Sequence, residues 1–198
     1  MRYEFARLHQ RLKTTTVYVT HDQVEAMTLA DRIALLDQGR VVQFGTAEEI
    51  YEHPCSLFVA GFIGSPRMNF FQGSLTESGP SGATIRLREG DEFGADVGAH
   101  GAGAGDAATL GVRPEHLRLA ASGLAATVTL IESLGSVRFA YLTTGATDEP
   151  VIMQLAPDDR PKEGDRVALA AEKKNCHLFD AAGRAFPRLA ADPGAIAA

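Results

Sequence analysis

The sequence has few of the features that mark secreted, membrane-spanning or nucleic-acid-binding proteins. Its two cysteines, Cys55 and Cys176, lie far apart and show no CxxC or Cys/His ligand spacing, so we expect reduced thiols. The longest apolar run, residues 57–63, is much shorter than the roughly 20 residues that cross a bilayer. The N-terminus lacks the apolar region of a secretory signal. The cytoplasm is therefore the expected compartment.

Basic charge is not in surplus in any part of the chain. The formal net charge is −6, with 6 Lys and Arg against 8 Asp and Glu in residues 1–64, and 13 against 17 in the remainder. Proteins that bind the phosphate backbone of nucleic acids carry a basic patch or stripe. We therefore expect no nucleic-acid partner. The hydrophobic content of 45% is that of an ordinary globular protein with a core.

Hydrophobic periodicity predicts a helix and then a strand at the start of the chain. Phe5, Leu8 and Leu12 share one helical face, which predicts an amphipathic helix over residues 2–13. Thr15–Thr20 is rich in β-branched residues and has no charge, which is typical of a strand buried on both faces in a parallel sheet.

The residues after this strand carry helix-start signals. Asp22 stands at an N-cap position and Glu25 follows three residues later, which predicts a reciprocal capping box. A helix is expected from just after His21 to about Ala30. Ile33–Leu36 is expected to form a second buried strand.

Turn and capping patterns organise residues 37–63. Residues 37–39 have turn chemistry, so residues 40–45 are expected to form a hairpin with the preceding strand. Thr46 and Glu49 form a second capping-box pattern that opens a short helix, which Pro54 closes from beyond. One further helix is expected over residues 56–63.

From residue 65 the sequence alternates short β-like runs with glycine-containing turns, which indicates a small barrel or sandwich. Residues 90–108 contain six glycines and are expected to form a mobile loop. We predict three parts: residues 1–64, residues 65–186 and a flexible tail, 187–198. The runs that predict strands are Asn69–Thr76, Ala83–Arg88, Thr109–Leu119, Ala126–Leu134, Val137–Thr143, Val151–Leu155, Arg166–Ala171 and Cys176–Phe179.

The first part poses a physical difficulty, because a parallel sheet needs cover on both faces. Residues 1–64 offer too few elements to cover the expected strands. We therefore expect further strands beside Thr15–Thr20, supplied either by another chain or by residues that would precede Met1.

His21 is the candidate functional residue of this part. Histidines near the ends of elements are usually structural, but ligands gather outside the carboxyl ends of strands in open α/β sheets, where a histidine can donate a hydrogen bond to phosphate. His21 and Glu25 could share a metal on one helix face, yet no third ligand lies nearby in sequence, so we expect no metal. The absence of a GxSxG motif gives no support for a hydrolase triad.

The run TTTVYVTHDQVEAMTLADRIALLDQGRVVQFGTAEEIYEHPCSLFVAGFIGSPRMNF resembles the end of the ATPase domain of ABC transporters, and more narrowly that of bacterial sugar importers of the maltose and glycerol-3-phosphate type. The resemblance covers residues 2–71. It implies that His21 is the switch, or H-loop, histidine, which contacts the γ-phosphate of ATP and helps position the attacking water. Asp22 and Glu25 would support it.

Three later segments are similar to the OB-type regulatory domain, called TOBE, that follows the ATPase domain in these importers. Arg113, Glu115 and His116 lie in the first of them, and we favour a structural role for them, with Arg113 pairing with a carboxylate across the barrel. The resemblance implies that the domain holds an ATPase homodimer together. The segments are LGVRPEHLRL, TVTLIESLGSVRFAYL and GDRVALAAEKKNCHLFDAAGRAF.

The sequence lacks the GxxxxGK[ST] loop that holds phosphates and Mg²⁺ in this family, and also the signature and Walker B motifs. The SGPSGA stretch faintly resembles the signature, but it lies in the wrong domain. ATP and Mg²⁺ are expected cofactors of an intact subunit. This chain alone is expected to bind neither and to be inactive.

The predicted fold is an α/β fragment, the end of a P-loop ABC ATPase domain, followed by an all-β OB-type (TOBE) barrel. The predicted function is that of the ATP-binding subunit of a carbohydrate importer, on the inner face of the plasma membrane with permease subunits as partners. One alternative is a standalone regulatory or dimerisation module without ATPase activity. The others are a subunit of a polyamine or iron importer and a solute-binding OB domain, for example for an oxyanion.

Overall fold

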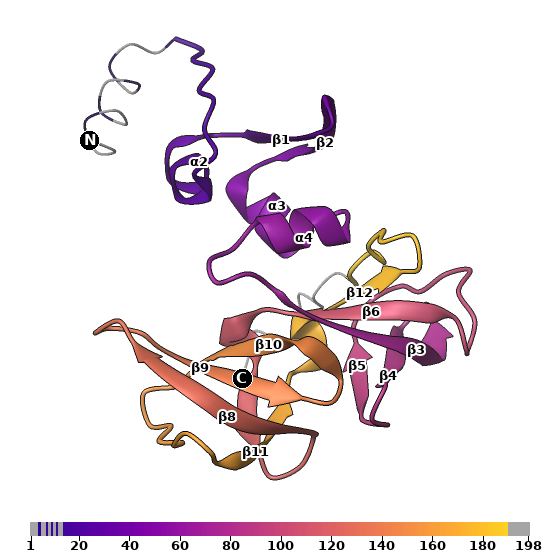
Figure 1. Cartoon of the computed structure of the whole chain (residues 1–198). Coiled ribbons are helices and arrows are strands. Elements are labelled where there is room, and N and C mark those ends of the chain that lie inside the picture. The colour runs from indigo at the N-terminus through magenta and orange to yellow at the C-terminus, as the bar shows by residue number, and fades with distance from the viewer. Residues whose placement is uncertain (1–3, 5–6, 8, 10, 12–13, 190–198) are drawn as a thin grey trace, which may run out of the picture.

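The computed structural model describes residues 4, 7, 9, 11 and 14–189 of the 198-residue chain. The apolar residues of the helix expected over residues 2–13, Phe5, Leu8 and Leu12, lie outside the described residues. We call residues 14–63 the N-terminal segment, and residues 64–189 the β domain. Figure 1 shows the helices and hairpin of the N-terminal segment on one side of the two sheets of the β domain.

The expected strand Thr15–Thr20 is not a strand in this chain. The residues have no regular secondary structure, and Val17 and Val19 are 87% and 90% exposed. A strand is held by ladder hydrogen bonds to a neighbour, and among the described residues none pairs with this segment. The prediction of a strand buried on both faces is therefore wrong for the chain by itself.

Helix α2 (Gln23–Leu29) and a β-hairpin follow. Strands β1 (Ile33–Asp37) and β2 (Arg40–Gly45) are antiparallel, as predicted. Gln38 and Gly39 both have positive φ, 46° and 76°, which is the type I′ turn that matches the twist of a two-residue hairpin. The second strand is therefore present where it was predicted, but only one of its faces is buried, and Leu36 is 62% exposed.

Two short helices complete the N-terminal segment, where they were predicted. In α3 (Ala47–Glu52) the Thr46 hydroxyl accepts from the backbone N–H of Glu49, and the Glu49 carboxylate accepts from the N–H of Thr46, so the predicted capping box is confirmed. Ser56 caps α4 (Leu57–Phe62) from one side, with its hydroxyl accepting from the N–H of Val59. A small core joins these helices to the hairpin and consists of Ile33, Leu35, Ile50, Val59 and Ile63.

Two five-stranded antiparallel sheets make up the β domain, with strand orders β12-β6-β3-β4-β5 and β10-β9-β8-β11-β7. Both contribute to one hydrophobic core. The strands not bounded elsewhere are β3 (Asn69–Gly79), β4 (Gly82–Leu87), β8 (Leu124–Ser133), β9 (Arg138–Thr144), β10 (Thr147–Gln154), β11 (Arg166–Ala170) and β12 (Cys176–Asp180), the last preceded by the 3-10 turn η2 (Lys173–Asn175).

Asn69 connects the two sheets. Its side-chain N–H₂ donates to the carbonyls of Val112 and Ile152, at 3.1 and 2.8 Å, and its Oδ1 accepts from the N–H of Ile152 at 2.8 Å. A buried amide is stable only where its donors and acceptors are satisfied. Asn69 therefore holds the start of β3 against β10 in a single register.

The run Thr109–Leu119, expected as one strand, is divided between the two sheets. Strand β6 (Ala107–Val112) pairs with β3 and β12, then η1 (Pro114–His116) turns the chain, and β7 (Arg118–Ala120) pairs with β11 in the other sheet. Proline has no N–H to donate to a ladder and ends a central strand. The prediction of one continuous strand is wrong.

Residues 90–108 are not simply a loop. Strand β5 (Glu92–Ala95) pairs with β4, and burial alternates from Phe93 to Val97, after which Gly98 and Ala99 are also buried. Alternating burial over residues 93–97 is the period of a strand with one face in the core. The expectation of a mobile loop over the whole stretch is therefore wrong.

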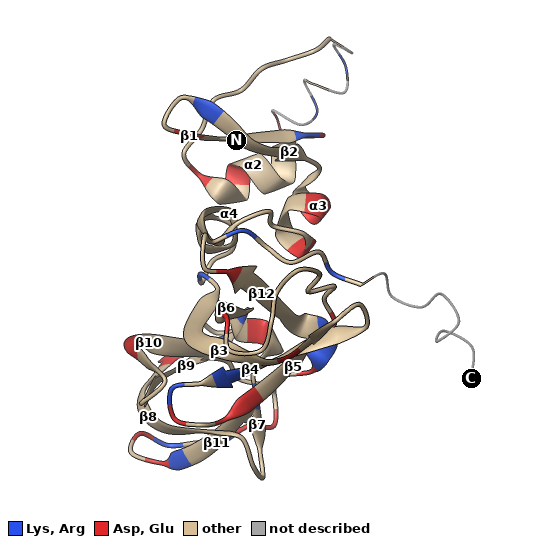
Figure 2. Ribbon diagram, turned by 90° about the vertical axis from the view of Figure 1, so that its right-hand side faces the viewer, with Lys and Arg blue, Asp and Glu red and all other residues tan. Residues whose placement is uncertain are grey.

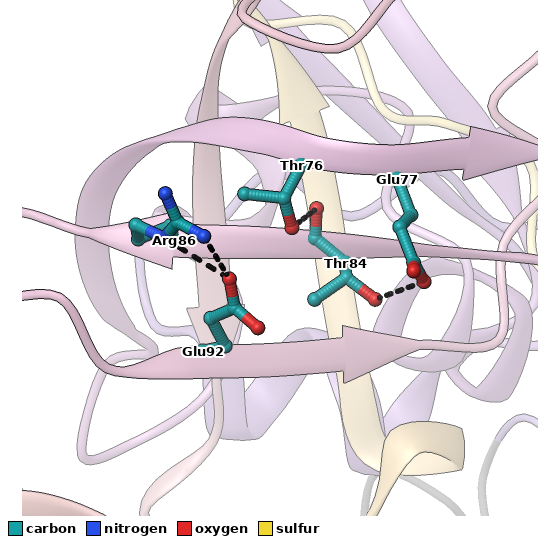
Figure 3. A network of polar contacts seen from close by, with 5 residues as sticks. All are labelled: Thr76, Glu77, Thr84, Arg86 and Glu92. Carbon is teal, nitrogen blue, oxygen red and sulfur yellow. Dashed lines mark hydrogen bonds and ion pairs between the residues drawn. The ribbon is translucent and has the colours of Figure 1, made fainter.

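The outer face of β3, β4 and β5 carries a polar network, drawn in Figure 3. Thr76 lies where the register between β3 and β4 shifts, and its hydroxyl donates to the Thr84 carbonyl. The Thr84 hydroxyl donates to Glu77, while Arg86 binds Glu92 through two nitrogens at 3.0 and 2.7 Å. The charges cover a solvent-facing sheet near its edge, which disfavours edge-to-edge pairing.

Three residues of the segment predicted as a flexible tail are described, and they are bonded to the β domain. The Pro187 carbonyl accepts from the N–H of Gly98, and the Leu189 N–H donates to the Asp96 carbonyl. Basic and acidic side chains are interspersed over the molecule (Figure 2). Within the described part of the chain, no helix combines the length and apolar character needed to cross a membrane.

Candidate functional site

His21 lies at the bend between the extended residues 14–20 and helix α2, and it is exposed to solvent. The bend is built by local hydrogen bonds. Asp22 is the N-cap residue, and its Oδ1 accepts from the N–H groups of Val24 and Glu25 at 2.8 and 3.2 Å. A carboxylate in this position satisfies two of the N–H groups that a helix start leaves unpaired. The backbone on the C-terminal side of His21 is therefore fixed.

The predicted capping box at Asp22 and Glu25 is half right. The Glu25 carboxylate does not accept from the N–H of Asp22, which instead donates to the Thr20 hydroxyl at 3.0 Å. Glu25 Oε2 accepts from the hydroxyls of Thr20 and Tyr18, at 3.0 and 3.2 Å. The hydrogen bond to Glu25 raises the pKa of Tyr18. Glu25 thus ties the extended residues before His21 to the helix after it.

Gln23, the first residue of α2, connects the His21 bend to a distant part of the chain. Its Oε1 accepts from the backbone N–H of Gly64 at 2.7 Å. Ala26 and Met27 of the same helix pack against the small core of the N-terminal segment. Helix α2, which begins two residues after His21, therefore rests on the end of the N-terminal segment, where the β domain begins.

Arg113 is the centre of the junction between the N-terminal segment and the β domain. It is 1% exposed, and its Nη1 and Nη2 donate to the carbonyls of Ile63 and Tyr51, at 2.8 and 2.6 Å. These carbonyls lie in the last turn of α3 and at the C-cap of α4, where carbonyls lack helical partners and the helix dipole favours a cation. The guanidinium also lies 3.5 Å above the Tyr51 ring centroid.

The structural role predicted for Arg113 fits this geometry, but the predicted partner is wrong, since the two hydrogen bonds of its guanidinium go to backbone carbonyls and not to a carboxylate. Glu115 instead accepts from the Tyr51 hydroxyl. Burial lowers the pKa of Arg113 and also that of His116, whose Nδ1 is buried without a hydrogen-bond partner among the described residues. Desolvation raises the pKa of Tyr51.

A second arginine reaches the same junction from the C-terminal end of the β domain. Arg188 Nη1 donates to the carbonyl and carboxylate of Glu52, at 3.2 and 3.3 Å. His177 on β12 is 4% exposed, and burial, together with the charges of Arg188 and Arg113, lowers its pKa to about 3. His177 is therefore neutral at physiological pH. The last turn of α3 is held by two arginines, because Arg113 donates to the carbonyl of Tyr51 and Arg188 to that of Glu52.

The described residues contain no group of three or more His, Cys, Asp or Glu side chains placed to hold a metal ion. A shallow hollow of about 430 Å³ lies over β8, β9 and β11, where Thr127, Thr143 and Arg166 face one another across the three strands. Most residues that line the hollow have small side chains and are at least partly exposed to solvent. The structure thus brings Asp22 and Glu25 around the His21 bend, whereas Arg113, Glu115 and His116 lie at the junction.

Sequence reasoning overlooked Gln23, Tyr51 and Gly64. Gly64 has φ +114°, and a Cβ on it would lie 2.7 Å from Arg113 Nη1, so the close approach requires glycine. The available signal in the sequence was the glycine itself, because Gly64 directly follows the helix expected over residues 56–63. The partners of Gln23 and Tyr51 lie 41 and 64 residues away, where no local pattern reaches.

Two known domain families match the chain. Residues 64–117 match the MalK OB fold domain, and residues 110–179 match the TOBE domain. The junction residue Arg113 lies within both matches, and Gly64 is the first residue of the first match.

Curated proteins are similar over nearly the whole chain. The alpha-glucoside transport ATP-binding protein AglK of Rhizobium meliloti is 42% identical over 93% of this chain and 52% of its own length. The sn-glycerol-3-phosphate import ATP-binding protein UgpC of Chromobacterium violaceum is 45% identical over 91% and 48%. The maltose/maltodextrin import ATP-binding protein MalK of Aliivibrio fischeri is 40% identical over 98% and 53%. The chain spans about half the length of these relatives.

Among solved structures, the cytoplasmic molybdate-binding protein ModG aligns with 56% of this chain and 94% of its own, at 21% identity and a TM-score of 0.47. A similarity this low carries no argument about function.

Proposed function

Because this chain carries a TOBE domain and a MalK OB fold domain and is homologous over most of its length to the ATP-binding proteins of ABC sugar importers, we propose that it supplies the switch histidine and regulatory domain of such a subunit. The observation that carries the proposal is identity of 40–45% over 91–98% of the chain. In this proposal residues 1–64 end the ATPase domain, residues 65–186 form the regulatory domain, and residues 187–198 form a tail.

His21 is the proposed catalytic residue. An exposed imidazole can donate a hydrogen bond to an oxygen of the γ-phosphate and help to orient the attacking water, because positioning and charge stabilisation carry most of phosphoryl transfer. Asp22 fixes the backbone after His21, and Glu25 fixes the residues before it. Both side chains support the proposed role by holding the bend.

ATP and Mg²⁺ are the proposed cofactors of the intact subunit, and a second ATPase subunit and membrane permease subunits are the proposed partners. The subunit would lie on the inner face of the plasma membrane. The names of the relatives support a carbohydrate or glycerol phosphate as the transported solute.

The first prediction concerns nucleotide binding. Phosphates in this family are held mainly by a Gly-rich loop with a lysine, which the sequence does not contain. We expect the 198-residue chain to show no MgATP binding at micromolar concentrations by calorimetry. Micromolar binding would show that residues of this chain suffice to hold the phosphates, and would contradict this prediction.

The second prediction concerns His21 in a complete subunit that contains these residues. We expect His21→Ala to leave ATP affinity nearly unchanged and to lower the ATP turnover rate by about 100-fold or more, because a positioned group in the transition state contributes about that much. His100→Ala, at another exposed histidine, is the matched control and should leave turnover unchanged. Normal turnover in His21→Ala would remove His21 from the mechanism.

A further inference from the structure

The bend that carries His21 and the buried Arg113 meet at two consecutive residues of the chain. The N–H of Gly64 donates to Gln23 Oε1 at 2.7 Å, and the carbonyl of Ile63 accepts from Arg113 Nη1 at 2.8 Å. Gln23 directly follows Asp22, the N-cap of helix α2, and Asp22 directly follows His21. A short series of hydrogen bonds therefore runs from the β domain to the residue next to Asp22.

Helix α2 has few other anchors. None of its residues is buried, and its apolar contacts are those of Ala26 and Met27 with the small core that includes Ile63. A seven-residue helix is not stable by itself in water, so its position depends on such tertiary contacts. The Gln23 to Gly64 hydrogen bond is thus a substantial part of what holds α2.

Arg113 is a rigid end point for this series. Its guanidinium is buried, stacks on the Tyr51 ring and donates a second hydrogen bond to the Tyr51 carbonyl at 2.6 Å. The approach to Gly64 is close enough that a Cβ there would collide with Nη1. A displacement of Arg113 would therefore take a hydrogen bond from the peptide group that joins Ile63 to Gly64, the same peptide group whose N–H donates to Gln23.

We propose that Gln23 and Arg113 are positioning residues for His21, through which the β domain sets the place of helix α2. The proposal rests on the function proposed for His21. Gln23 acts directly on α2, whereas Arg113 acts through the backbone of Ile63 and Gly64. Neither side chain contacts a reacting atom in this scheme.

The first test is residue-resolved amide hydrogen exchange on the 198-residue chain. Gln23→Met removes the acceptor for the Gly64 N–H while keeping side-chain size, and Gln23→Glu keeps an acceptor oxygen. We expect Gln23→Met to raise exchange at Ala26, Ala30 and Gly64 about fivefold, the effect of losing one ordinary hydrogen bond on local opening. Gln23→Glu should restore the rates to within about twofold.

Gln43→Met is the matched control, because Gln43 also bridges distant residues, with its amide bonded to the carbonyl of His53 and the N–H of Cys55. It should leave the exchange of α2 amides unchanged. If Gln23→Met changes exchange at Gly64 alone, or if Gln43→Met affects α2 equally, the hydrogen bond does not position the helix and the proposal is overturned.

The second test is a double-mutant cycle with Arg113→Lys, which keeps a positive charge but cannot reach the Ile63 and Tyr51 carbonyls together with one ammonium group. We expect it to raise exchange at Ala26 and Ala30 about threefold in the native background, and to have no further effect after Gln23→Met. Equal effects in both backgrounds, or none, would overturn the coupling. If Arg113→Lys destabilises the whole chain, the amide of the buried Leu142 will also exchange faster. In that case the results for the Gln23 variants alone decide whether the hydrogen bond positions α2.

In a complete subunit, Gln23→Met should lower kcat for ATP about fivefold with KM nearly unchanged, and Gln23→Glu should recover it. A purely structural role would not give that pattern. If His21→Ala has no effect while the exchange coupling holds, the proposed function fails by itself. If His21→Ala abolishes turnover and Gln23→Met leaves kcat unchanged, the positioning proposal fails by itself.

Discussion

The β domain and the N-terminal segment differ in how completely each buries its own apolar side chains. The β domain closes one large core between its two sheets, whereas the N-terminal segment has a five-residue core. Among the described residues, nine of the exposed large apolar side chains lie in the N-terminal segment and three in the longer β domain. Apolar groups gathered in this way are typical of surfaces that pack against other protein.

The comparison shows that similar local signals lead to different burial. In both regions the sequence predicts caps, turns and strands that the structure contains. The strands of the β domain, however, pair with neighbouring strands in two sheets that enclose one core. Residues 15–20 have the composition of a buried strand and find none among the described residues. A strand-like sequence therefore becomes a strand only where another backbone supplies its ladder.

The largest expected effect lies in the β-domain core. Leu142→Ala removes a fully buried side chain between the sheets, so it should lower the free energy of unfolding by about 3 kcal/mol, measured by urea denaturation. The control is Leu130→Ala, at a half-exposed residue of the neighbouring strand, which should cost less than about 1 kcal/mol. Equal losses would mean that the core is not the main source of stability.

The next effect depends on pH at the junction. Burial lowers the pKa of His177 from 6.5 to about 3 in the folded chain, so below pH 6.5 the unfolded chain binds the proton more readily. The contribution of neutral His177 to the free energy of unfolding is complete above pH 6.5 and is lost as the pH falls toward 3. We expect the free energy of unfolding to fall by about 2 kcal/mol between pH 7 and pH 5 for this reason.

The measurement is the free energy of unfolding in urea at both pH values. His177→Leu should remove most of the loss, because leucine has no proton to bind. His100→Ala, at an exposed histidine, should leave the loss as it is in the native chain. The same pH dependence in His177→Leu would assign the loss to another group.

The smallest expected effect lies in the exposed segment before His21. Val17→Asn and Val19→Asn should each change the free energy of unfolding of the 198-residue chain by less than about 0.5 kcal/mol, since both side chains are largely exposed. In a complete subunit we expect the same changes to be strongly destabilising, because the segment would then be a buried strand. A large loss in the 198-residue chain would mean that this segment is already packed.

The sequence by itself determined the features whose partners lie within a few residues. The capping box of Thr46 and Glu49, the Asp22 cap, a turn within residues 37–39, and most strands were predicted for this reason. The apolar residues at positions 93, 95, 97 and 99 also have the two-residue period of a strand, but the glycines at positions 94 and 98 favoured the prediction of a loop.

The tertiary structure alone decided which faces are buried and which distant groups meet. Residues 109–119 are divided between two sheets. Glu25 accepts hydrogen bonds from the hydroxyls of Tyr18 and Thr20 and not from the N–H of Asp22. Arg113 donates to the carbonyls of Tyr51 and Ile63. The physical reason is the range of each interaction. A cap or turn is satisfied by the adjacent backbone, whereas a buried guanidinium takes whichever acceptors the packed helices present to it.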